Sequence, residues 1–327
     1  MLRRLFTRAL TTENSPTADL YFADACRDWL EDGRVVRYAP TVFASATTRL
    51  VIRHDGRAPA ASRRPRTVYL LDDAIDLEGA DDALSAYWRF KLKVVEKAAA
   101  DAFLPGAAAA VVSSPALEDM IRARAPTLDI RRLDPFWATP FSDLSHHGEE
   151  TFRIAYLGSQ VHGPDIEPLA EMLAAFLDET PEAELVLAGG HEALAPFANH
   201  RQVKALGPQP WAKYRQTLRR LRPHAALYPL RDTPFNAARS LNKLIEHAVA
   251  GAAGLYAASW PGAAMAEEAG AGFALPPDPA AWRAALMGLS YQRRQAAQMA
   301  AKGVALAETV NDREAQRRLW AELLEIG

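Results

Sequence analysis

The chain of 327 residues is long enough for two domains of ordinary size or for one large α/β domain. Its composition, 49% hydrophobic and 24% charged, is that of a globular protein with a substantial core. A formal net charge of -2 argues against nucleic-acid binding by bulk charge, and the single cysteine, Cys26, excludes an internal disulfide. A cytoplasmic protein is therefore expected, and no apolar stretch approaches the roughly 20 residues of a membrane-spanning helix.

Short apolar runs alternate with longer amphipathic stretches, which is typical of βαβ units around a parallel sheet. In the first half, strands are predicted at 34–38, 49–53 and 67–71 and in a run ending at Ser114, with helices at 20–31 and 84–100. Asp72 and Asp73 directly follow the strand TVYLL. Asp73 is therefore a candidate for orienting or deprotonating an acceptor hydroxyl, although two turn aspartates would explain the pair equally well.

The second half begins after RRLDPFWATPFSDLSHHGEE, a stretch rich in Pro, Ser and charge that is typical of a linker. Strands are predicted at 152–157, 183–187, 202–206, 225–229 and 254–257, with helices at 165–177 and 212–221. The sequence therefore predicts two doubly wound domains, 1–148 and 149–308, that face each other across a cleft. A final helix within 309–327, anchored by Trp320 and Leu324, is expected to join the first domain.

The first strand of the second half ends in AYLGSQVHGPD, which carries candidate ligand-binding residues. Gly158 permits close approach of the backbone, and the amides that follow it, beginning at Ser159, can meet an anion. His162 can change its charge near neutral pH. A plain strand-to-helix turn with Asp165 as the helix cap explains the same residues. The spacing is not GxGxxG, so the dinucleotide fingerprint is absent.

A second candidate lies in KALGPQPWAKY, where a loop connects a predicted strand to a helix. The residues Gly207, Pro208 and Gln209 precede a further proline, and a backbone stiffened in this way can hold polar groups against a flat ring such as a nucleobase. Trp211 is expected to anchor the helix that follows rather than to stack on a ligand.

The most informative stretch is RDTPFNAARSLNKLIEHAVAGAAG, which lies between two apolar runs. Wound as one helix, it places on a single face Asn236, Arg239, Ser240, Lys243, Glu246 and His247. An ordinary amphipathic helix explains this periodicity. However, the neighbouring cations Arg239 and Lys243 near the helix start and the carboxylate of Glu246 near its end both lower helix stability. Residues that lower local stability are often found at functional sites. A ligand with a diphosphate at one end and a diol at the other would make both the cations and the carboxylate favourable at these positions.

These pieces together resemble the donor-binding domain of GT-B fold glycosyltransferases, in particular the large retaining family with many bacterial cell-surface polysaccharide enzymes. The resemblance rests on AYLGSQVHGPD, AELVLAGG, KALGPQPWAKY and DTPFNAARSLNKLIEHAVAG, and it covers roughly 152–257. The first half is similar more loosely, through TVYLLDDAID and ADAFLPGAAAAVVSSPAL. The resemblance implies an α/β protein of two Rossmann-like domains, the GT-B fold, and the transfer of a hexosyl group.

The resemblance also implies roles for particular residues. Glu246 would hold ribose hydroxyls, Lys243 and secondarily Arg239 would neutralise the diphosphate, Gly158 and Ser159 would approach the phosphates, and the loop 207–210 would border the base. The paired-glutamate motif of that family is incomplete, because Ala238 stands where its first Glu is expected. Other side chains would then contact the donor sugar, in a divergent branch with a PFN...K..E pattern: Asp232, Phe235, Asn236 and Ser240.

The expected chemistry is metal-independent transfer from a nucleotide-diphosphate sugar, with no cofactor, to a glycan, lipid-linked or protein acceptor, and with retention of configuration. Fixed cations can stabilise the departing diphosphate without a metal. The basic clusters ASRRPR and RQTLRRLRPH suggest peripheral contact with the inner membrane face, or a solvated surface. The alternatives are a catalytically lapsed nucleotide-sugar-binding or scaffold protein of the same fold, and an epimerase.

Overall fold

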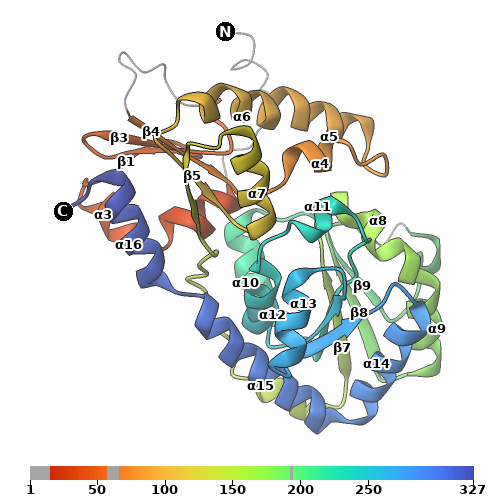
Figure 1. The fold of residues 1–327 in the computed structure, drawn as a ribbon. Helices are drawn as coiled ribbons and strands as arrows, with labels where there is room; N and C mark the ends of the chain where they lie inside the picture. Colours follow the sequence, from red (N-terminus) through yellow and green to blue (C-terminus); the bar gives the residue numbers. More distant parts are fainter. Residues whose placement is uncertain (1–14, 57–65, 192–193) are drawn as a thin grey trace. The chain divides into compact units, whose positions relative to one another are not determined.

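The computed structural model describes residues 15–56, 66–191 and 194–327, which fall into two compact units (Figure 1). Unit 1 contains the described residues up to Ala138 together with Ala238–Leu241 and Asn311–Gly327. Unit 2 contains Thr139–Ala237 and Asn242–Val310. The chain thus enters unit 1 three times, once through a segment of only four residues.

Unit 1 is built on a six-stranded sheet whose strand order follows the sequence. Antiparallel pairing joins β1, β2 and β3, and parallel pairing joins β3 to β6. The strands are β1 (Val36–Ala39), β2 (Val42–Ala44), β3 (Thr48–Ile52), β4 (Arg66–Leu71), β5 (Ala109–Val112) and β6 (Asp129–Arg132). The predicted strands 49–53 and 67–71 match β3 and β4 to within one residue, whereas the apolar pattern does not predict β2 or β6.

The helices of unit 1 pack on both the sheet and one another. They are α2 (Pro16–Ala18), η1 (Asp19–Ala23), α3 (Arg27–Glu31), α4 (Ile75–Gly79), α5 (Ala86–Lys91), η2 (Leu92–Lys97), α6 (Ala98–Phe103), η3 (Leu104–Gly106), α7 (Pro115–Arg124) and α16 (Arg313–Leu324). The elements α5, η2 and α6 follow without a break and form one rod (Figure 1). The terminal helix α16 packs against η1 and β3, with Trp320 and Leu324 fully buried.

Unit 2 is built on a six-stranded parallel sheet with the order β12-β11-β10-β7-β8-β9. Its strands are β7 (Phe152–Leu157), β8 (Ala183–Ala188), β9 (Val203–Leu206), β10 (Ala225–Tyr228), β11 (Ala253–Ala257) and β12 (Gly272–Leu275). The chain moves outward from β7 to β9 and returns to β10 on the other side of β7. A ligand binds most often beyond the carboxyl ends of two such strands, where the winding reverses.

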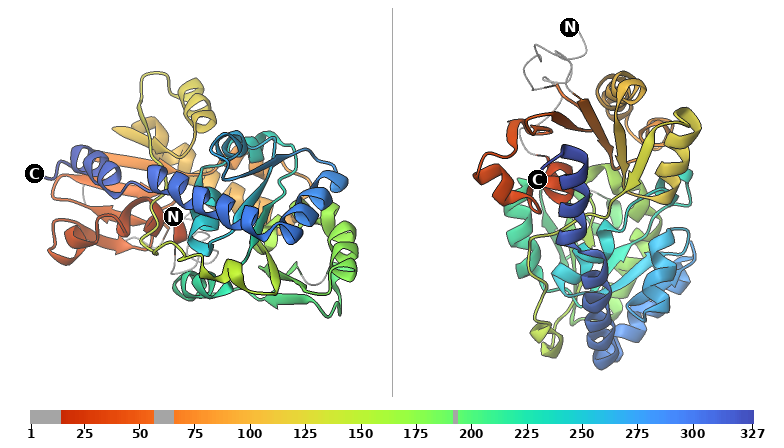
Figure 2. Two further views of the ribbon diagram at one scale, coloured as in Figure 1. Left: turned by 90° about the horizontal axis from the view of Figure 1, so that it is seen from below. Right: turned by 60° about the vertical axis from the view of Figure 1, so that its left-hand side comes forward.

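The helices of unit 2 cover both faces of this sheet. They are η4 (Ser145–Gly148), η5 (Gln160–His162), α8 (Gly163–Ile166), η6 (Glu167–Leu169), α9 (Ala170–Glu179), η8 (Ala195–Phe197), α10 (Trp211–Leu221), α11 (Pro234–Ala237), α12 (Asn242–Ala250), α13 (Pro261–Glu268), α14 (Pro279–Tyr291) and α15 (Arg293–Val310). The long helix α15 lies along α12 (Figure 2). Among the described residues, no helix is long and apolar enough to cross a membrane.

Candidate functional site

The reversal point of the unit 2 sheet lies between β7 and β10, and the predicted donor-site residues come from the loops after these strands. Strand β7 leads into Gly158 and Ser159, and β10 leads through Leu230 and Asp232 into α11 and α12. The apolar runs FRIAYL and AALY form these strands because both faces of a parallel sheet are covered by helices. The first polar or glycine residues after them therefore lie at the sheet edge.

The single helix predicted over the stretch from Asn236 to Glu246 is wrong. Helix α11 ends at Ala237, and α12 begins at Asn242. The four residues between them belong to unit 1, where Ser114 Oγ donates a 2.6 Å hydrogen bond to the carbonyl of Ala238. Arg239 and Ser240 therefore do not share a helix with Lys243, and Glu246 lies at the middle of α12 rather than near its end.

Lys243 lies at the reversal point. Its ammonium group donates hydrogen bonds to the carbonyl of Leu157, the last residue of β7, and to Glu246 Oε2. The same group lies 5.7 Å from the ring centroid of Tyr228, the last residue of β10. A half-buried cation is thus fixed between the two strand ends at which an anionic ligand is expected.

Glu246 is buried, yet both of its carboxylate oxygens have partners. Lys243 contacts Oε2, and the phenol of Tyr214 on α10 donates a 2.7 Å hydrogen bond to Oε1. Burial, and then the charge of Glu246, raise the pKa of Tyr214 well above its ordinary value, so the phenol stays protonated and can donate. The carboxylate is therefore held in one position by two donors from two helices.

Asp165 organises a second polar cluster in unit 2. This buried carboxylate accepts hydrogen bonds from the amide of Arg231 at 3.2 Å and from Asn236 Nδ2 at 3.1 Å, and it lies 3.2 Å from His162 Nδ1. Asp165 lies inside α8, whose preceding residue is His162, so its predicted role as the cap of that helix is wrong. Its function in the structure is to fix the loop after β10 against the loop after β7.

The glycine turn after β7 is tightly packed. A Cβ atom placed on Gly189 would lie 2.2 Å from the carbonyl oxygen of Gly158, and Gly189 has a φ of +99°, which favours glycine. His191, which is buried, lies with Nε2 3.3 Å from the same carbonyl oxygen. This close packing explains why glycine is needed in the turn after β8. Ser159, which follows Gly158, is exposed.

The remaining predicted donor-site residues differ in exposure. Gly207 and Pro208 are exposed at the carboxyl end of β9, and Gln209 accepts a 2.8 Å hydrogen bond from Thr217 on α10. Asp232 is exposed, whereas Phe235 and Asn236 are buried. Trp211 begins α10 and stacks on Tyr214 with ring centroids 5.8 Å apart. The loop 207–210 therefore precedes the helix that carries the partner of Glu246.

In unit 1, Asp72 and Asp73 form part of a half-buried charge cluster centred on Arg53. The guanidinium group donates to Asp72 at 3.1 Å, to Asp73 at 2.7 Å and to Glu96 at 3.2 Å. Arg53 follows β3 with a φ of +60°, an uncommon conformation for a residue with a Cβ, and Tyr69 donates a 2.9 Å hydrogen bond to its carbonyl. The candidate base Asp73 is thus tied to a cation.

Two carboxyl groups in this cluster hold protons at higher pH than usual. Burial raises the pKa of Asp72 to about 6 against the opposing effect of Arg53, and burial with the charge of Asp73 raises the pKa of Glu78 to about 7. Glu78 Oε1 accepts a 2.9 Å hydrogen bond from Trp88 Nε1. Arg239, which belongs to unit 1, has a positive charge that lowers the pKa of Glu78 against these two effects.

No group of three or more His, Cys, Asp or Glu side chains suited to a metal ion occurs among the described residues. Metal independence remains a prediction. Sequence analysis did not identify Tyr214, Arg53 or Glu78 as site residues. For Tyr214 a signal existed, because Trp211, Tyr214 and Leu218 recur at helical spacing and mark the less exposed face of α10.

Replacing Tyr214 by phenylalanine tests whether its hydroxyl positions Glu246. We expect the Kd for a nucleoside diphosphate to rise about tenfold, since a hydrogen bond to a charged group contributes about 1.5 kcal/mol or more. Isothermal titration measures this, and Gln216→Ala, at an exposed position on the same helix, is the control. A 2′,3′-dideoxy nucleotide should bind both proteins equally, because it offers no diol for Glu246. Equal weakening for this analogue would contradict the positioning role.

No protein-family model and no curated protein matches the chain. Solved structures do. A sucrose-phosphate synthase from Thermosynechococcus elongatus is similar with a TM-score of 0.56 at 15% identity, over 81% of this chain and 70% of that one. HepE of Anabaena, solved with UDP and glucose, is similar with a TM-score of 0.57 at 18% identity, over 81% of this chain and 72% of that one. WaaG, a glycosyltransferase involved in lipopolysaccharide biosynthesis, is similar with a TM-score of 0.58 at 14% identity, over 78% of this chain and 74% of that one.

These similarities, with the two six-stranded and largely parallel sheets, define the class of fold. The chain has the GT-B fold, and the α/β class predicted from the sequence is confirmed. The assignment to a divergent branch that lacks the first glutamate stays a prediction.

Proposed function

We propose that this protein transfers a sugar from a nucleotide-diphosphate sugar to an acceptor hydroxyl. The observation that carries the proposal is the position of Lys243, whose ammonium group bonds to the last carbonyl of β7 and lies over the last ring of β10. A fixed cation at the reversal point of a parallel sheet suits a ligand that carries a diphosphate. HepE, a protein of the same fold, was solved with UDP-glucose.

Two side chains of α12 divide the donor between them in this proposal. Lys243 stabilises the negative charge that grows on the diphosphate as the bond to the sugar breaks, while Glu246 accepts hydrogen bonds from the ribose diol. Each carboxylate oxygen has a lone pair beyond those used by Tyr214 and Lys243. The backbone at Gly158 and Ser159 approaches the phosphates, and the loop 207–210 borders the base.

The finer assignments belong to the same proposal. A hexosyl group is transferred with retention and without a metal or cofactor, since Lys243, with Arg239 as the second candidate, supplies the charge that a metal would supply. Asp73 orients the acceptor hydroxyl, and Asp232, Asn236 and His162 lie on the donor side. The acceptor is a glycan or a lipid-linked or protein substrate, and the role is cell-surface glycan synthesis in a bacterial cytoplasm, with peripheral contact to the membrane.

A nucleotide-sugar-binding protein without turnover is the second candidate, and one observation favours it. Ala238 stands where the retaining family has its first glutamate, and its backbone is fixed by Ser114 in unit 1. No carboxylate can therefore act from this position. Turnover distinguishes the candidates, because a transferase releases nucleoside diphosphate when an acceptor is supplied, whereas a binding protein does not. An epimerase would change the donor without an acceptor.

Thermal unfolding with a panel of nucleoside diphosphates tests the donor site directly. A nucleotide at one hundred times its Kd should stabilise the protein by about 2.7 kcal/mol. We expect at least one uridine, guanosine or adenosine diphosphate to raise the midpoint of the wild type, and Glu246→Gln to reduce the increase. An absence of any increase across the panel would contradict the proposed site, whatever the catalytic outcome.

A further inference from the structure

His162 lies in the loop after β7, and a carboxylate holds one of its two ring nitrogens. Its Nδ1 lies 3.2 Å from Asp165 Oδ2, and the phenol of Tyr156 donates a 2.8 Å hydrogen bond to its backbone carbonyl. The Asp165 side chain is only 5% exposed, whereas the imidazole of His162 is 21% exposed. The ring is therefore anchored on a buried carboxylate and still reaches the surface at the carboxyl edge of the unit 2 sheet.

The groups that face this ring come from three loops of unit 2. Asp165 itself lies 3.4 Å from Nε of Arg231, in the loop after β10. His191, in the loop after β8, borders the same turn, because a Cβ atom on Gly163 would lie 3.6 Å from His191 Nδ1. A neighbouring carboxylate stabilises the positive charge of a protonated imidazole, and Arg231 opposes this effect. Histidine changes its charge near neutral pH, so the charge of His162 can vary under ordinary conditions.

The protonation of His162 decides the sign of the charge at the reversal point. The other ionised side chains of residues 158–166, residues 229–237 and α12 are two cations and three carboxylates: Lys243, Arg231, Glu246, Asp165 and Asp232. Burial lowers the pKa of His247 well below its ordinary value, so this histidine stays neutral. This edge of unit 2 is therefore negative while His162 is neutral, and it loses that net charge when His162 gains a proton. An anionic diphosphate is repelled only by the first state.

We propose that protonated His162, positioned by Asp165, binds the diphosphate of the donor together with Lys243, so that donor affinity rises as the pH falls. The inference rests on the proposed function, because it needs a diphosphate at the reversal point. Lys243 shares its charge with Glu246, and His162 adds a charge-assisted hydrogen bond from Nε2 to a phosphate oxygen. Asp165 acts as a positioning residue, since it contacts the ring and not the ligand.

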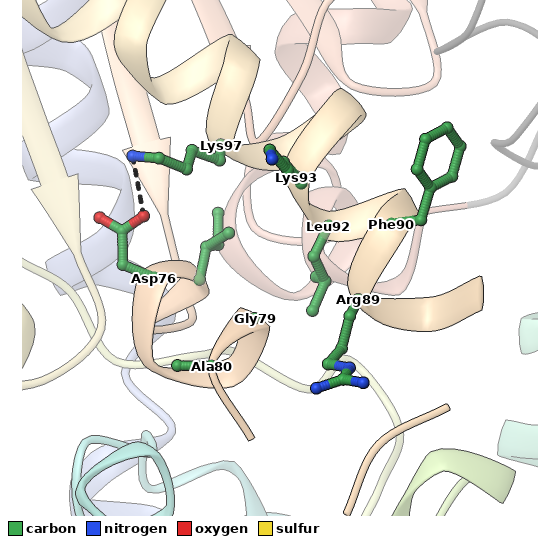
Figure 3. A pocket seen from close by; sticks show the side chains of 9 residues that line it. Asp76, Gly79, Ala80, Arg89, Phe90, Leu92, Lys93 and Lys97 are labelled. Atoms are coloured by element: carbon green, nitrogen blue, oxygen red, sulfur yellow. Dashed lines mark ion pairs between the residues drawn. The ribbon is translucent and has the colours of Figure 1, made fainter. Parts of the chain in front are cut away.

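Two other cationic regions of the protein contain groups whose charge does not vary near neutral pH. In unit 1, a cavity of about 440 Å³ lies between α4 and the rod, where Lys97 points toward Asp76 at 3.0 Å and Arg89 is bonded to Asp82 (Figure 3). Most of the basic cluster ASRRPR lies outside the described residues, and RQTLRRLRPH lies mainly on α10. The exposed last turn of α10 leads back to the amino end of β10, opposite the carboxyl edge that carries His162.

Donor affinity measured against pH tests this inference. The probes are UDP-glucose, GDP-mannose and ADP-glucose, whose doubly esterified diphosphates do not titrate between about pH 6 and pH 8.5. We expect the Kd of the tightest-binding probe to rise about tenfold over this range in the wild type, because one charge-assisted hydrogen bond is lost. His162→Gln should bind weakly at every pH. His162→Arg, which is always charged, should bind at every pH as tightly as the wild type does at the lower limit.

The matched control is His200→Gln, because His200 Nε2 also lies near a carboxylate, Asp178 at 3.4 Å, but precedes the amino end of β9. Its profile should equal that of the wild type. Asp165→Asn should move the midpoint of the profile to lower pH, a shift that a purely structural role would not produce; if this variant does not fold, the His162 series decides. A flat wild-type profile, or one that His162→Gln leaves unchanged, overturns the inference and leaves the donor site intact. If none of the three probes binds, the donor site is wrong and the role of His162 fails with it.

Discussion

The variant Lys243→Met should transfer sugar at least about 100-fold more slowly than the wild type, because removing one donor that stabilises developing negative charge typically costs this much. Methionine keeps the length of the side chain and removes its charge. The loss should appear in kcat, since the diphosphate carries more negative charge when it leaves than when it is bound to the sugar. The measurement is the rate of nucleoside diphosphate release with donor and acceptor both saturating.

A control is needed because Lys243 also has a structural role. Without it, Glu246 becomes a buried carboxylate whose remaining bond is to Tyr214, and breaking a buried ion pair costs about 3–5 kcal/mol. Lys243→Met with Glu246→Gln removes both charges and should regain most of the lost stability without regaining activity. Lys213→Met, at an exposed position on α10, should leave stability and rate unchanged. A double variant with wild-type kcat would exclude Lys243 from the chemistry.

The sheets of both units could be predicted because their strands are short apolar runs that end in glycine, proline or polar residues. Strand β7 was predicted with its observed bounds, and β10 to within one residue. The positions after these strands follow from the topology of parallel sheets, so Gly158 and the loop after Tyr228 could be chosen as site residues before any coordinates. Strands β2, β6 and β12 were missed because each is both short and incompletely buried, so none of them is a continuous apolar run like that of β10.

The break between α11 and α12 could not be predicted, because the amphipathic pattern continues through it. Residues 238–241 leave helical geometry in unit 1, where Ala238 is bonded to Ser114, 124 positions away in the chain. Periodicity reports local winding and carries no information on such a contact. The same limit applies to Arg53, whose three carboxylate partners come from the loop after β4 and from the rod, and to the bond between Tyr214 and Glu246.

The two units should respond to pH in opposite directions. In unit 2, burial lowers the pKa of His147 to about 4 and that of His224 to about 3. Their rings lie 5.1 Å apart, and His147 Nε2 lies 2.9 Å from the carbonyl of Gly251. The unfolded chain binds protons at these residues below about pH 6.5, whereas the folded unit does not, so stability is full above this pH and is lost as pH falls toward 4.

In unit 1 the sign is reversed. The pKa of Asp72 is raised to about 6 and that of Glu78 to about 7, so the folded unit holds protons that the unfolded chain has released. The stability from these groups is therefore present below about pH 4 and is lost as pH rises through 6 and 7. Glu78→Gln removes one of the two groups and keeps an oxygen for Trp88 Nε1, so it should stabilise unit 1 at high pH by on the order of 2 kcal/mol.

Hydrogen exchange resolved by peptide, corrected for intrinsic rates, can follow the two units separately between about pH 5 and pH 7.5. On acidification we expect β7 and β10 of unit 2 to lose protection while β4 and β5 of unit 1 gain it. His147→Gln, which keeps a donor for Gly251, should reduce the loss in unit 2 alone, and Glu78→Gln should reduce the gain in unit 1 alone. Each of these buried groups should affect the stability of its own unit alone. If protection changes in the same direction in both units, or if one variant changes protection in both units, these groups do not govern the pH response.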